Sequence, residues 1–388
     1  MISHAKKEDR YHGFEQGPIR PPSEARSLLI RVTRNCPWNR CAFCPVYKGT
    51  RFSVRPEAHV VADIDDVHRH VVRLKELADG QGRISRQELD LHAQNLTEHD
   101  QQAFAVAFQW FAGGMTSIFL QDANSLVIKP DSLIRILRHI RSCFPWVERI
   151  TSYARSHTVA RISDAHLREM RESGLNRIHI GLESGSDAVL KQVRKGVDKA
   201  TQVKAGRKAK RAGMELSEYV MPGLGGRDLS REHALETADA LNQINPDFIR
   251  LRTLAIPGGI PLAEQQRSGQ FLKLNDLEMV REIRLFVETL DGIESMIVSD
   301  HILNLFEDVQ GRLPDAKPDI LAVLDRFLAL DPKDQCLFQV GRRLGIFTRM
   351  ADLDSPKRRD KVSAFCRQYG IGPENVDQMI DELMKRFI

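Results

Sequence analysis

Short apolar segments alternate with helical patterns through the first 254 residues, and this alternation constrains the fold more than any other feature. Each apolar segment is rich in β-branched or aromatic residues, which favours a strand. Apolar residues in the intervening segments recur at helical spacing. Strands that alternate with helices in this way form parallel sheets. The six predicted strands are residues 27–32, 116–120, 149–153, 177–182, 216–221 and 248–252.

This order predicts an α/β fold, a partial (β/α)6 TIM-like barrel with a helical C-terminal extension. We expect three parts: a loosely held N-terminal arm at 1–26, a barrel at 27–260 and the extension at 261–388. Residues 83–110 form a longer connection than one crossover needs. Strand signals fade after about residue 275. The helices predicted there are residues 276–290, 300–308, 317–330, 335–347, 357–369 and 373–386.

Three cysteines follow the first predicted strand. Cys36, Cys41 and Cys44 have the spacing C-x4-C-x2-C. Tetrahedral sulfur sites hold zinc or iron–sulfur clusters, and a complete cluster normally takes four thiolates. Three thiolates with no fourth beside them leave one iron of a [4Fe-4S] cluster open to another ligand. The triad therefore suggests a reactive cluster rather than an electron relay.

The spacing of the triad is also compatible with a zinc ion completed by a distant ligand such as His59 or His68. A chance grouping of thiols in a reducing compartment would give the same pattern. The remaining cysteines, Cys143, Cys336 and Cys366, are isolated in the sequence, which differs from a secreted disulfide framework and predicts no second cluster.

The composition points to a protein outside the membrane. No apolar run approaches the ~20 residues that a membrane-spanning helix needs, and residues 1–10 lack the apolar core of a signal peptide. We therefore expect a cytoplasmic protein, where thiols stay reduced. The net charge of +5 over 388 residues is weak support for a nucleic-acid partner. The dense basic run at 204–211 is predicted to be a solvated helix face.

Polar residues and glycines follow the other predicted strands. The carboxyl ends of parallel strands share one edge of the sheet, so we expect these residues to converge with the triad. Glu183 and the segment 121–124 follow a strand directly, and Arg155 follows one after a single residue. The last two strands lead into Gly/Pro turns at 221–226 and 254–259, where backbone approaches a ligand closely.

A longer motif adds to the triad. It reads Gly181-Leu182-Glu183-Ser184-Gly185-Ser186-Asp187-Ala188-Val189-Leu190, followed by Arg194-Lys195-Gly196. Together these residues resemble the radical S-adenosylmethionine (SAM) enzymes, in the branch of the methylthiotransferases, the elongator catalytic subunit and the cobalamin-dependent members. The resemblance covers roughly residues 27–260. The chain departs from it in the extra residue of the C-x4-C gap, and in Gln121-Asp122-Ala123-Asn124 at the place of the usual glycine-rich motif.

The resemblance implies an enzyme with two cofactors, a [4Fe-4S] cluster and SAM. Cys36, Cys41 and Cys44 would ligate three irons, and the open iron would bind the amino and carboxylate groups of SAM. One electron, from a reductant such as flavodoxin or ferredoxin, would yield a 5′-deoxyadenosyl radical. That radical would abstract a hydrogen atom from a substrate.

Eight further residues are candidates for binding SAM. Phe43 would contact adenine, Asp122 would accept a hydrogen bond from the ammonium, and Arg155 would pair with the carboxylate through its planar fork. Glu183 would lie near the ribose or the amino-acid end. The other candidates are Asn124, Met221, Gly223 and Ile256.

Several of these candidates are also suited to a structural role. Phe43 suits packing, and Asp122 and Asn124 suit a turn or a helix cap. Arg155 suits a structural ion pair, and Gly223 suits an ordinary turn.

The expected substrate is a small molecule, because the sequence shows no separate RNA-binding module. The extension and the 83–110 segment would shape its pocket, and Asp300 and His301 are candidates to line it, with Asp300 also suited to a helix cap. The 26 residues before the first strand are too few for a cobalamin domain. One alternative is tRNA modification. An alternative of another class is a non-catalytic iron–sulfur protein on the same fold.

Overall fold

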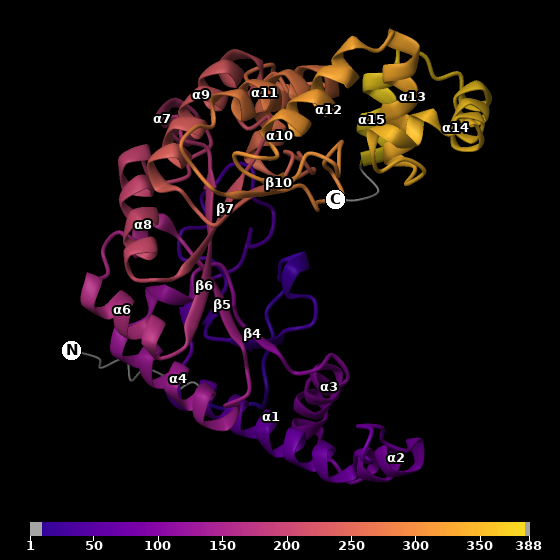
Figure 1. Ribbon diagram of the computed structural model, residues 1–388. Helices are drawn as coiled ribbons and strands as arrows, with labels where there is room; N and C mark the ends of the chain where they lie inside the picture. Colours follow the sequence, from indigo (N-terminus) through magenta and orange to yellow (C-terminus); the bar gives the residue numbers. More distant parts are fainter. Residues whose placement is uncertain (1–9, 385–388) are drawn as a thin grey trace.

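The computed structural model describes residues 10–384, and its centre is one curved sheet of eight strands (Figure 1). The strand order is β1-β4-β5-β6-β7-β8-β9-β10, with every pairing parallel except that of β10 with β9. The strands are β1 (Leu28–Arg31), β4 (Ser117–Gln121), β5 (Arg149–Ala154), β6 (Leu175–Glu183), β7 (Glu215–Val220), β8 (Phe248–Leu251), β9 (Met296–Val298) and β10 (Gly311–Arg312). The α/β partial barrel with six predicted strands is confirmed.

Helices cover the outer, convex side of the sheet (Figure 1). They are amphipathic: α4, for example, buries Leu133, Leu137 and Ile140 on one face, at the spacing of successive turns. These helices are α1 (Glu57–Leu77), α3 (Glu98–Ala112), α4 (Pro130–Cys143), α6 (Asp164–Glu172), α8 (Lys199–Arg211), α9 (Gly226–Ile244) and α11 (Asp276–Thr289). Shorter helices are α2 (Arg86–Gln94), α5 (Ser156–Val159), α7 (Asp187–Gln192) and α10 (Pro261–Arg267).

The sheet continues past residue 260, because β9 pairs with β8 in parallel. The segment 300–308, predicted as a helix, is instead a loop. Asn304 accounts for this: its side-chain Nδ2 donates to the Leu251 carbonyl at 2.9 Å, and its Oδ1 accepts from the Thr253 amide at 3.0 Å. These bonds hold the loop against the end of β8, so the segment does not form a helix.

The described part of the N-terminal arm is bound to the barrel and is not loose as predicted; residues 1–9 lie outside the described chain. The Gly17 amide donates to Gln121 Oε1 at 2.8 Å, and Gln121 Nε2 donates to the Ile19 carbonyl at 2.9 Å. Glu15 pairs with Arg31 at 2.6 Å. The arm therefore lies across the carboxyl ends of β1 and β4.

Four α-helices make up the last part of the described chain, at the upper right of Figure 1. They are α12 (Lys317–Ala329), α13 (Pro332–Arg343), α14 (Pro356–Tyr369) and α15 (Val376–Met384). The rings of Phe306, Phe327, Phe338 and Phe347 pack together with centroids 5.3–5.8 Å apart, which joins the 300–308 loop to α12 and α13. None of the helices in residues 10–384 is long and apolar enough to cross a membrane.

Candidate active site

The cysteine loop is held at both ends by a small hairpin. Strand β2 (Thr33–Arg34) precedes the loop and pairs with β3 (Ser53–Val54), which follows it. Inside the loop Asn39 has a left-handed backbone, with φ of 44°, and its amide donates to Cys36 Sγ at 3.4 Å. Asn35 is also left-handed, with φ of 67°. Asparagine tolerates this conformation better than most residues, so the loop accommodates the longer C-x4-C gap in a tight turn.

The loop is fixed to the residues directly after α7. The indole Nε1 of Trp38 donates to the Arg194 carbonyl at 2.8 Å, and the Ala42 amide donates to the Val193 carbonyl at 2.8 Å. The motif that follows β6 therefore positions the cysteine loop directly, which gives a physical reason for the two motifs to occur in one chain.

One cavity of about 460 Å³ lies at the carboxyl ends of the strands. Ligand pockets typically have volumes of about 300–1,000 Å³. Seven of the residues predicted to bind the cluster or SAM line it: Cys36, Cys41, Cys44, Phe43, Arg155, Glu183 and Met221. The convergence of these side chains, expected from the strand order, is what the structure shows.

Two cations lie beside the thiols. Arg155 packs its guanidinium over the Trp38 ring, 5.1 Å from the centroid, and donates to the Lys195 carbonyl at 2.7 Å. Burial raises the pKa of the Cys41 thiol, and the positive charges of Lys195 and Arg155 oppose that rise. Burial also lowers the pKa of Arg155. The site thus places positive charge where thiolates bound to iron would carry negative charge.

Glu183 ends β6 in a strained conformation. Its φ is 64°, and the pairing of β6 with β7 shifts register between Gly181 and Glu183. Non-glycine residues rarely adopt positive φ outside turns and functional sites. Its Oε1 lies 3.1 Å from Lys195 Nζ, so the strained residue brings a carboxylate onto the cavity wall beside a cation.

Asp122 is buried but is not among the residues that line the cavity. Its Oδ2 lies 2.7 Å from Arg31 Nε and accepts a hydrogen bond from the Asn35 amide at 3.0 Å. Its Oδ1 accepts from the Tyr47 hydroxyl at 3.0 Å. The carboxylate therefore joins β1, the start of the cysteine loop and Tyr47 on the cavity wall.

Asn124, Gly223 and Ile256 are likewise not among the residues that line the cavity. Asn124 Oδ1 accepts from the Arg155 amide at 3.1 Å, and so fixes the start of the Arg155 turn. The Gly223 amide donates to Glu282 Oε1 at 2.6 Å, with φ of 86°. Ile256 packs against the apolar cluster that contains Phe43.

Several lining residues were not predicted from the sequence. They include Tyr47, Tyr153, Lys195, Tyr219 and Arg252. Lys195 belongs to the motif after β6, and Arg252 ends a predicted strand, so both carried a usable signal. His301 lines the cavity as expected, whereas Asp300 pairs with Arg250 at 3.1 Å and is not one of the lining residues.

The donor set of the triad suits a cluster better than a single zinc ion. Three sulfurs on one zinc would lie about 3.8 Å apart, given Zn–S bonds of about 2.3 Å. Among the described residues, the donor atoms of Asp65, His139 and Cys143 all lie within 4.8 Å of one another, as they would around one metal ion. The three cysteines of the triad do not form such a close group. The two histidines considered as a fourth ligand are not among the cavity residues: His59 packs on Tyr11 and His68 on Phe144.

Comparison with known proteins agrees with this geometry. The sequence model of the radical SAM superfamily matches residues 30–240, more than half of the chain. Two tRNA uridine(34) acetyltransferases, from Methanocaldococcus infernus and Methanocaldococcus jannaschii, are each 19% identical, over 274 and 281 residues. Each alignment covers 69% of this chain and 50% or 49% of the relative. The chain thus spans about half the length of the curated relatives it matches.

Two solved structures of radical SAM enzymes are also similar to the chain, at low sequence identity. Coproporphyrinogen III oxidase from Escherichia coli is 16% identical, with a TM-score of 0.45 over 68% of this chain and 52% of that one. The methyltransferase TsrM from Kitasatospora setae is 14% identical, with a TM-score of 0.44 over 87% and 61%. From the family match and the cysteine triad at the strand ends, the chain belongs to the radical SAM superfamily, whose members are enzymes that use a [4Fe-4S] cluster and SAM.

Proposed function

We propose that this enzyme generates a 5′-deoxyadenosyl radical and uses it to take a hydrogen atom from a small, anionic molecule. The observation that carries the proposal is the composition of one cavity. The cysteine triad lies on its wall together with Arg252 and His301, which come from the end of β8 and the loop after β9. Cofactor and substrate would share this space.

The residues next to the triad would hold the cofactors. When bound, the [4Fe-4S] cluster supplies the electron that cleaves SAM. Arg155 and the Glu183–Lys195 pair offer fixed charges of both signs, which suits the carboxylate and ammonium of SAM. Phe43 and Met221 offer apolar surface for adenine.

Asp122 and Asn124 would not contact the cofactor themselves but would position residues that line the cavity. Both carboxylate oxygens of Asp122 already accept hydrogen bonds, and Asn124 is bonded to the Arg155 amide. We propose that they position Tyr47 and Arg155, which line the cavity. Gly223 and Ile256 would similarly support the wall that adenine contacts.

The anionic character of the substrate follows from Arg252. Its side chain is exposed and has no ion-pair or side-chain hydrogen-bond partner among residues 10–384. His301 lies beside it, and burial together with the positive charge of Arg252 lowers the pKa of His301 to about 4. A neutral imidazole next to an unpaired guanidinium suits a carboxylate or phosphate group, with Arg252 carrying the charge.

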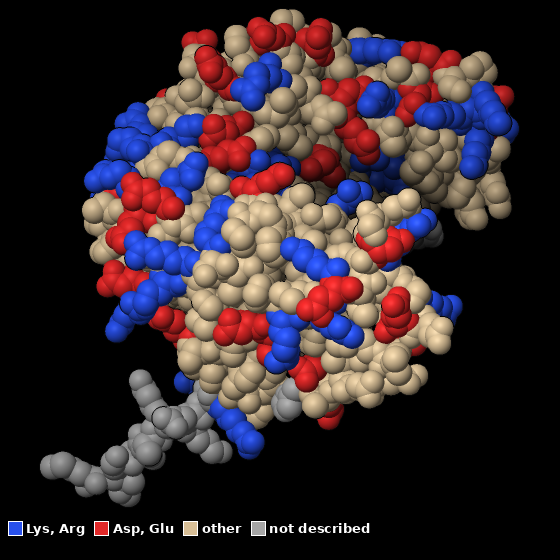
Figure 2. Space-filling view, turned by 60° about the horizontal axis from the view of Figure 1, so that its bottom comes forward, with Lys and Arg blue, Asp and Glu red and all other residues tan. Residues whose placement is uncertain are grey.

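Modification of tRNA is the second candidate, because the two curated relatives carry that activity in their names. The surface gives it less support. In the basic run of α8, Lys210 pairs with Asp247 at 2.6 Å, and Lys208 and Arg211 pair with Asp164. On the face shown in Figure 2, the described basic side chains are interspersed with acidic ones.

We also propose the division into arm (1–26), catalytic barrel (27–260) and helical extension (261–388), with the His301 loop of the extension closing the substrate side. A flavodoxin or ferredoxin would supply the electron. These assignments predict that substrate recognition and SAM cleavage depend on different residues of one cavity.

The test begins with anaerobic reconstitution of the cluster, followed by dithionite and SAM. We expect 5′-deoxyadenosine, detected by mass spectrometry, and none from the Cys41→Ala variant. A fully loaded protein that binds SAM by calorimetry but yields no 5′-deoxyadenosine would contradict the proposal and favour a non-catalytic role.

Substrate class is tested by isotope transfer. Deuterated small carboxylates and phosphate esters, and bulk tRNA, are offered separately, and deuterium is sought in 5′-deoxyadenosine. Transfer from a small anion, lost in Arg252→Leu while substrate-free SAM cleavage persists, would support the proposal. Transfer from tRNA would favour the second candidate.

A further inference from the structure

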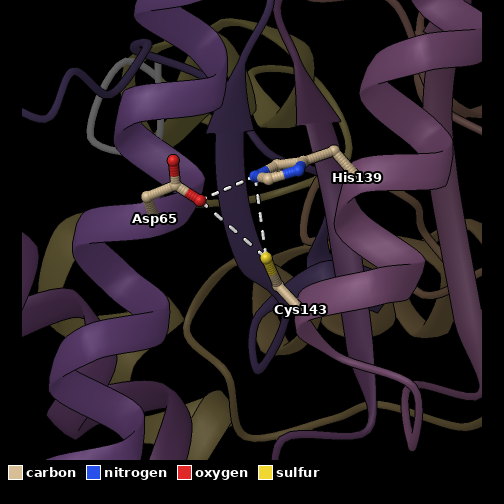
Figure 3. A group of neighbouring side chains, drawn as sticks. All are labelled: Asp65, His139 and Cys143. Atoms are coloured by element: carbon tan, nitrogen blue, oxygen red, sulfur yellow. Dashed lines mark hydrogen bonds and ion pairs between the residues drawn. The ribbon is translucent and has the colours of Figure 1, made fainter.

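A second group of metal-ligating side chains lies on the outer side of the barrel. Asp65 projects from α1, and His139 and Cys143 project from α4, toward one point (Figure 3). His139 Nε2 lies 2.7 Å from Asp65 Oδ1 and 3.6 Å from Cys143 Sγ, and Cys143 Sγ lies 3.9 Å from Asp65 Oδ1. None of the three lines the cavity of the cysteine triad.

The helical spacing brings these atoms together without any unusual backbone. His139 and Cys143 are four residues apart on α4, so they lie on one face, one turn apart. Helix α1 packs alongside α4 and presents Asp65 to that face. The side chains of Asp65 and His139 are 55% and 31% exposed, which leaves an entry path from solvent.

The two distances from the Cys143 sulfur are close to those of a tetrahedral zinc site. Zinc bonds of about 2.0–2.1 Å to nitrogen or oxygen and about 2.3 Å to sulfur place sulfur about 3.6 Å from either lighter atom. The two observed sulfur distances, 3.6 and 3.9 Å, are within about 0.3 Å of this value. The imidazole–carboxylate distance of 2.7 Å is that of a hydrogen bond, and it would widen to about 3.4 Å when a metal replaces the shared proton.

We propose that Asp65, His139 and Cys143 bind one zinc-type divalent cation, with water at the fourth position. Sulfur and imidazole donors select zinc, cobalt or nickel over magnesium and calcium. The cysteine must be deprotonated on binding, so the metal displaces one thiol proton. The bound ion would join α1 to α4 on the outer side of β1 and β4, and so brace the part of the sheet from which the cysteine loop departs.

The experiment uses the cluster-loaded enzyme, because an empty triad would itself take up zinc. After loosely bound metal is removed with a chelator, zinc is titrated in competition with a chromophoric chelator, and the melting temperature is followed. We expect one zinc per chain beyond the iron of the cluster, and a rise in melting temperature with zinc but not with magnesium. Cys143→Ser and His139→Ala should each weaken zinc binding at least about tenfold.

A matched control is available where α6 meets the same helix. Asp131 of α4 pairs with His166 of α6 at 3.5 Å, a surface carboxylate–imidazole pair in which no cysteine takes part. His166→Ala should leave zinc affinity unchanged. Equal zinc binding by the wild type, Cys143→Ser and His139→Ala would overturn the proposal, as would a wild type that binds no zinc beyond its cluster. All three variants should keep their full iron content, which separates loss of this site from loss of the fold.

Discussion

Glu183 Oε1 lies 3.1 Å from Lys195 Nζ on the wall of the cavity that holds the cysteine triad. The pair joins the last residue of β6 to the segment after α7, and the Lys195 ammonium also lies 5.7 Å from the centre of the Phe43 ring. Both side chains are nearly buried, at 13% and 11% exposure. Replacement of either residue therefore leaves an uncompensated charge on the wall of the cavity, beside the proposed SAM site.

Lys195→Met should weaken SAM binding to the cluster-loaded enzyme by roughly tenfold or more, because a charged hydrogen bond contributes about 1.5–3 kcal/mol. Calorimetry with SAM measures the change. Lys199→Met is the control, since Lys199 pairs with Glu236 at 2.6 Å on the outer surface. Equal affinity in the wild type and Lys195→Met would contradict the assigned role.

Alanine at any one of Cys36, Cys41 or Cys44 should abolish the cluster, because two thiolates do not retain a [4Fe-4S] group. Iron analysis and the visible spectrum of the reconstituted protein check this. Cys366→Ala is the control: Cys366 is buried in the C-terminal helices and should leave the iron content at about four per chain. An iron content near eight in the wild type would contradict the prediction of a single cluster.

Asp122→Ala should destabilise the fold by about 3 kcal/mol, because it leaves the partly buried Arg31 guanidinium with one partner fewer. Urea unfolding measures the change. Tyr47→Phe removes one of the bonds to the same carboxylate and should cost about 1 kcal/mol. If Asp122 instead served SAM alone, its loss would change SAM affinity and leave the unfolding midpoint in place.

Gly185→Ala should destabilise the protein by about 1–3 kcal/mol through overpacking. A Cβ at this position would lie 2.2 Å from the Glu236 carbonyl oxygen, which belongs to the backbone of α9 and has little room to move. Gly80→Ala is the control, since a Cβ there meets no atom within 4 Å, and its effect should stay within about 0.5 kcal/mol. Thermal unfolding compares the two variants, and similar melting temperatures would refute the close packing of the β6 motif on α9.

His301 should make stability depend on pH. Burial lowers its pKa from 6.5 to about 4, so between these values the unfolded chain binds a proton that the folded chain does not. Its contribution is therefore complete above about pH 6.5 and is lost as the pH falls toward 4. The melting temperature of the wild type should fall more between about pH 7.5 and pH 5.5 than that of His301→Gln. Parallel curves would contradict a half-buried, neutral His301.

Much of the barrel was predictable because its strands are short, apolar and flanked by helical patterns. The three-residue β9 is too short to give such a signal, and it forms because β8 offers an edge. The 300–308 loop has apolar residues at helical spacing, yet the bonds from Asn304 to β8 override that local preference. Both errors come from tertiary contacts that a local pattern does not contain.

The same distinction between local sequence patterns and tertiary contacts applies to the candidate active site. The triad, Arg155 and Glu183 were predictable because residues at the carboxyl ends of parallel strands converge. Asp122 lies on the predicted loop, but its side chain faces Arg31 of β1, and sequence spacing does not tell which way a loop side chain points. Arg252 and His301 meet through the folding of the chain after β8, which no motif encodes.

The N-terminal arm has a consequence for the evolution of such enzymes. Ile19 contributes to the cavity wall, although it belongs to a segment that reaches the strand ends from outside the barrel. The attachments of the arm include the bonds between Gln121 and the backbone of Gly17 and Ile19. A related enzyme with a different arm would therefore have a differently shaped cavity for its substrate. Its strands and its cysteine loop would stay unchanged.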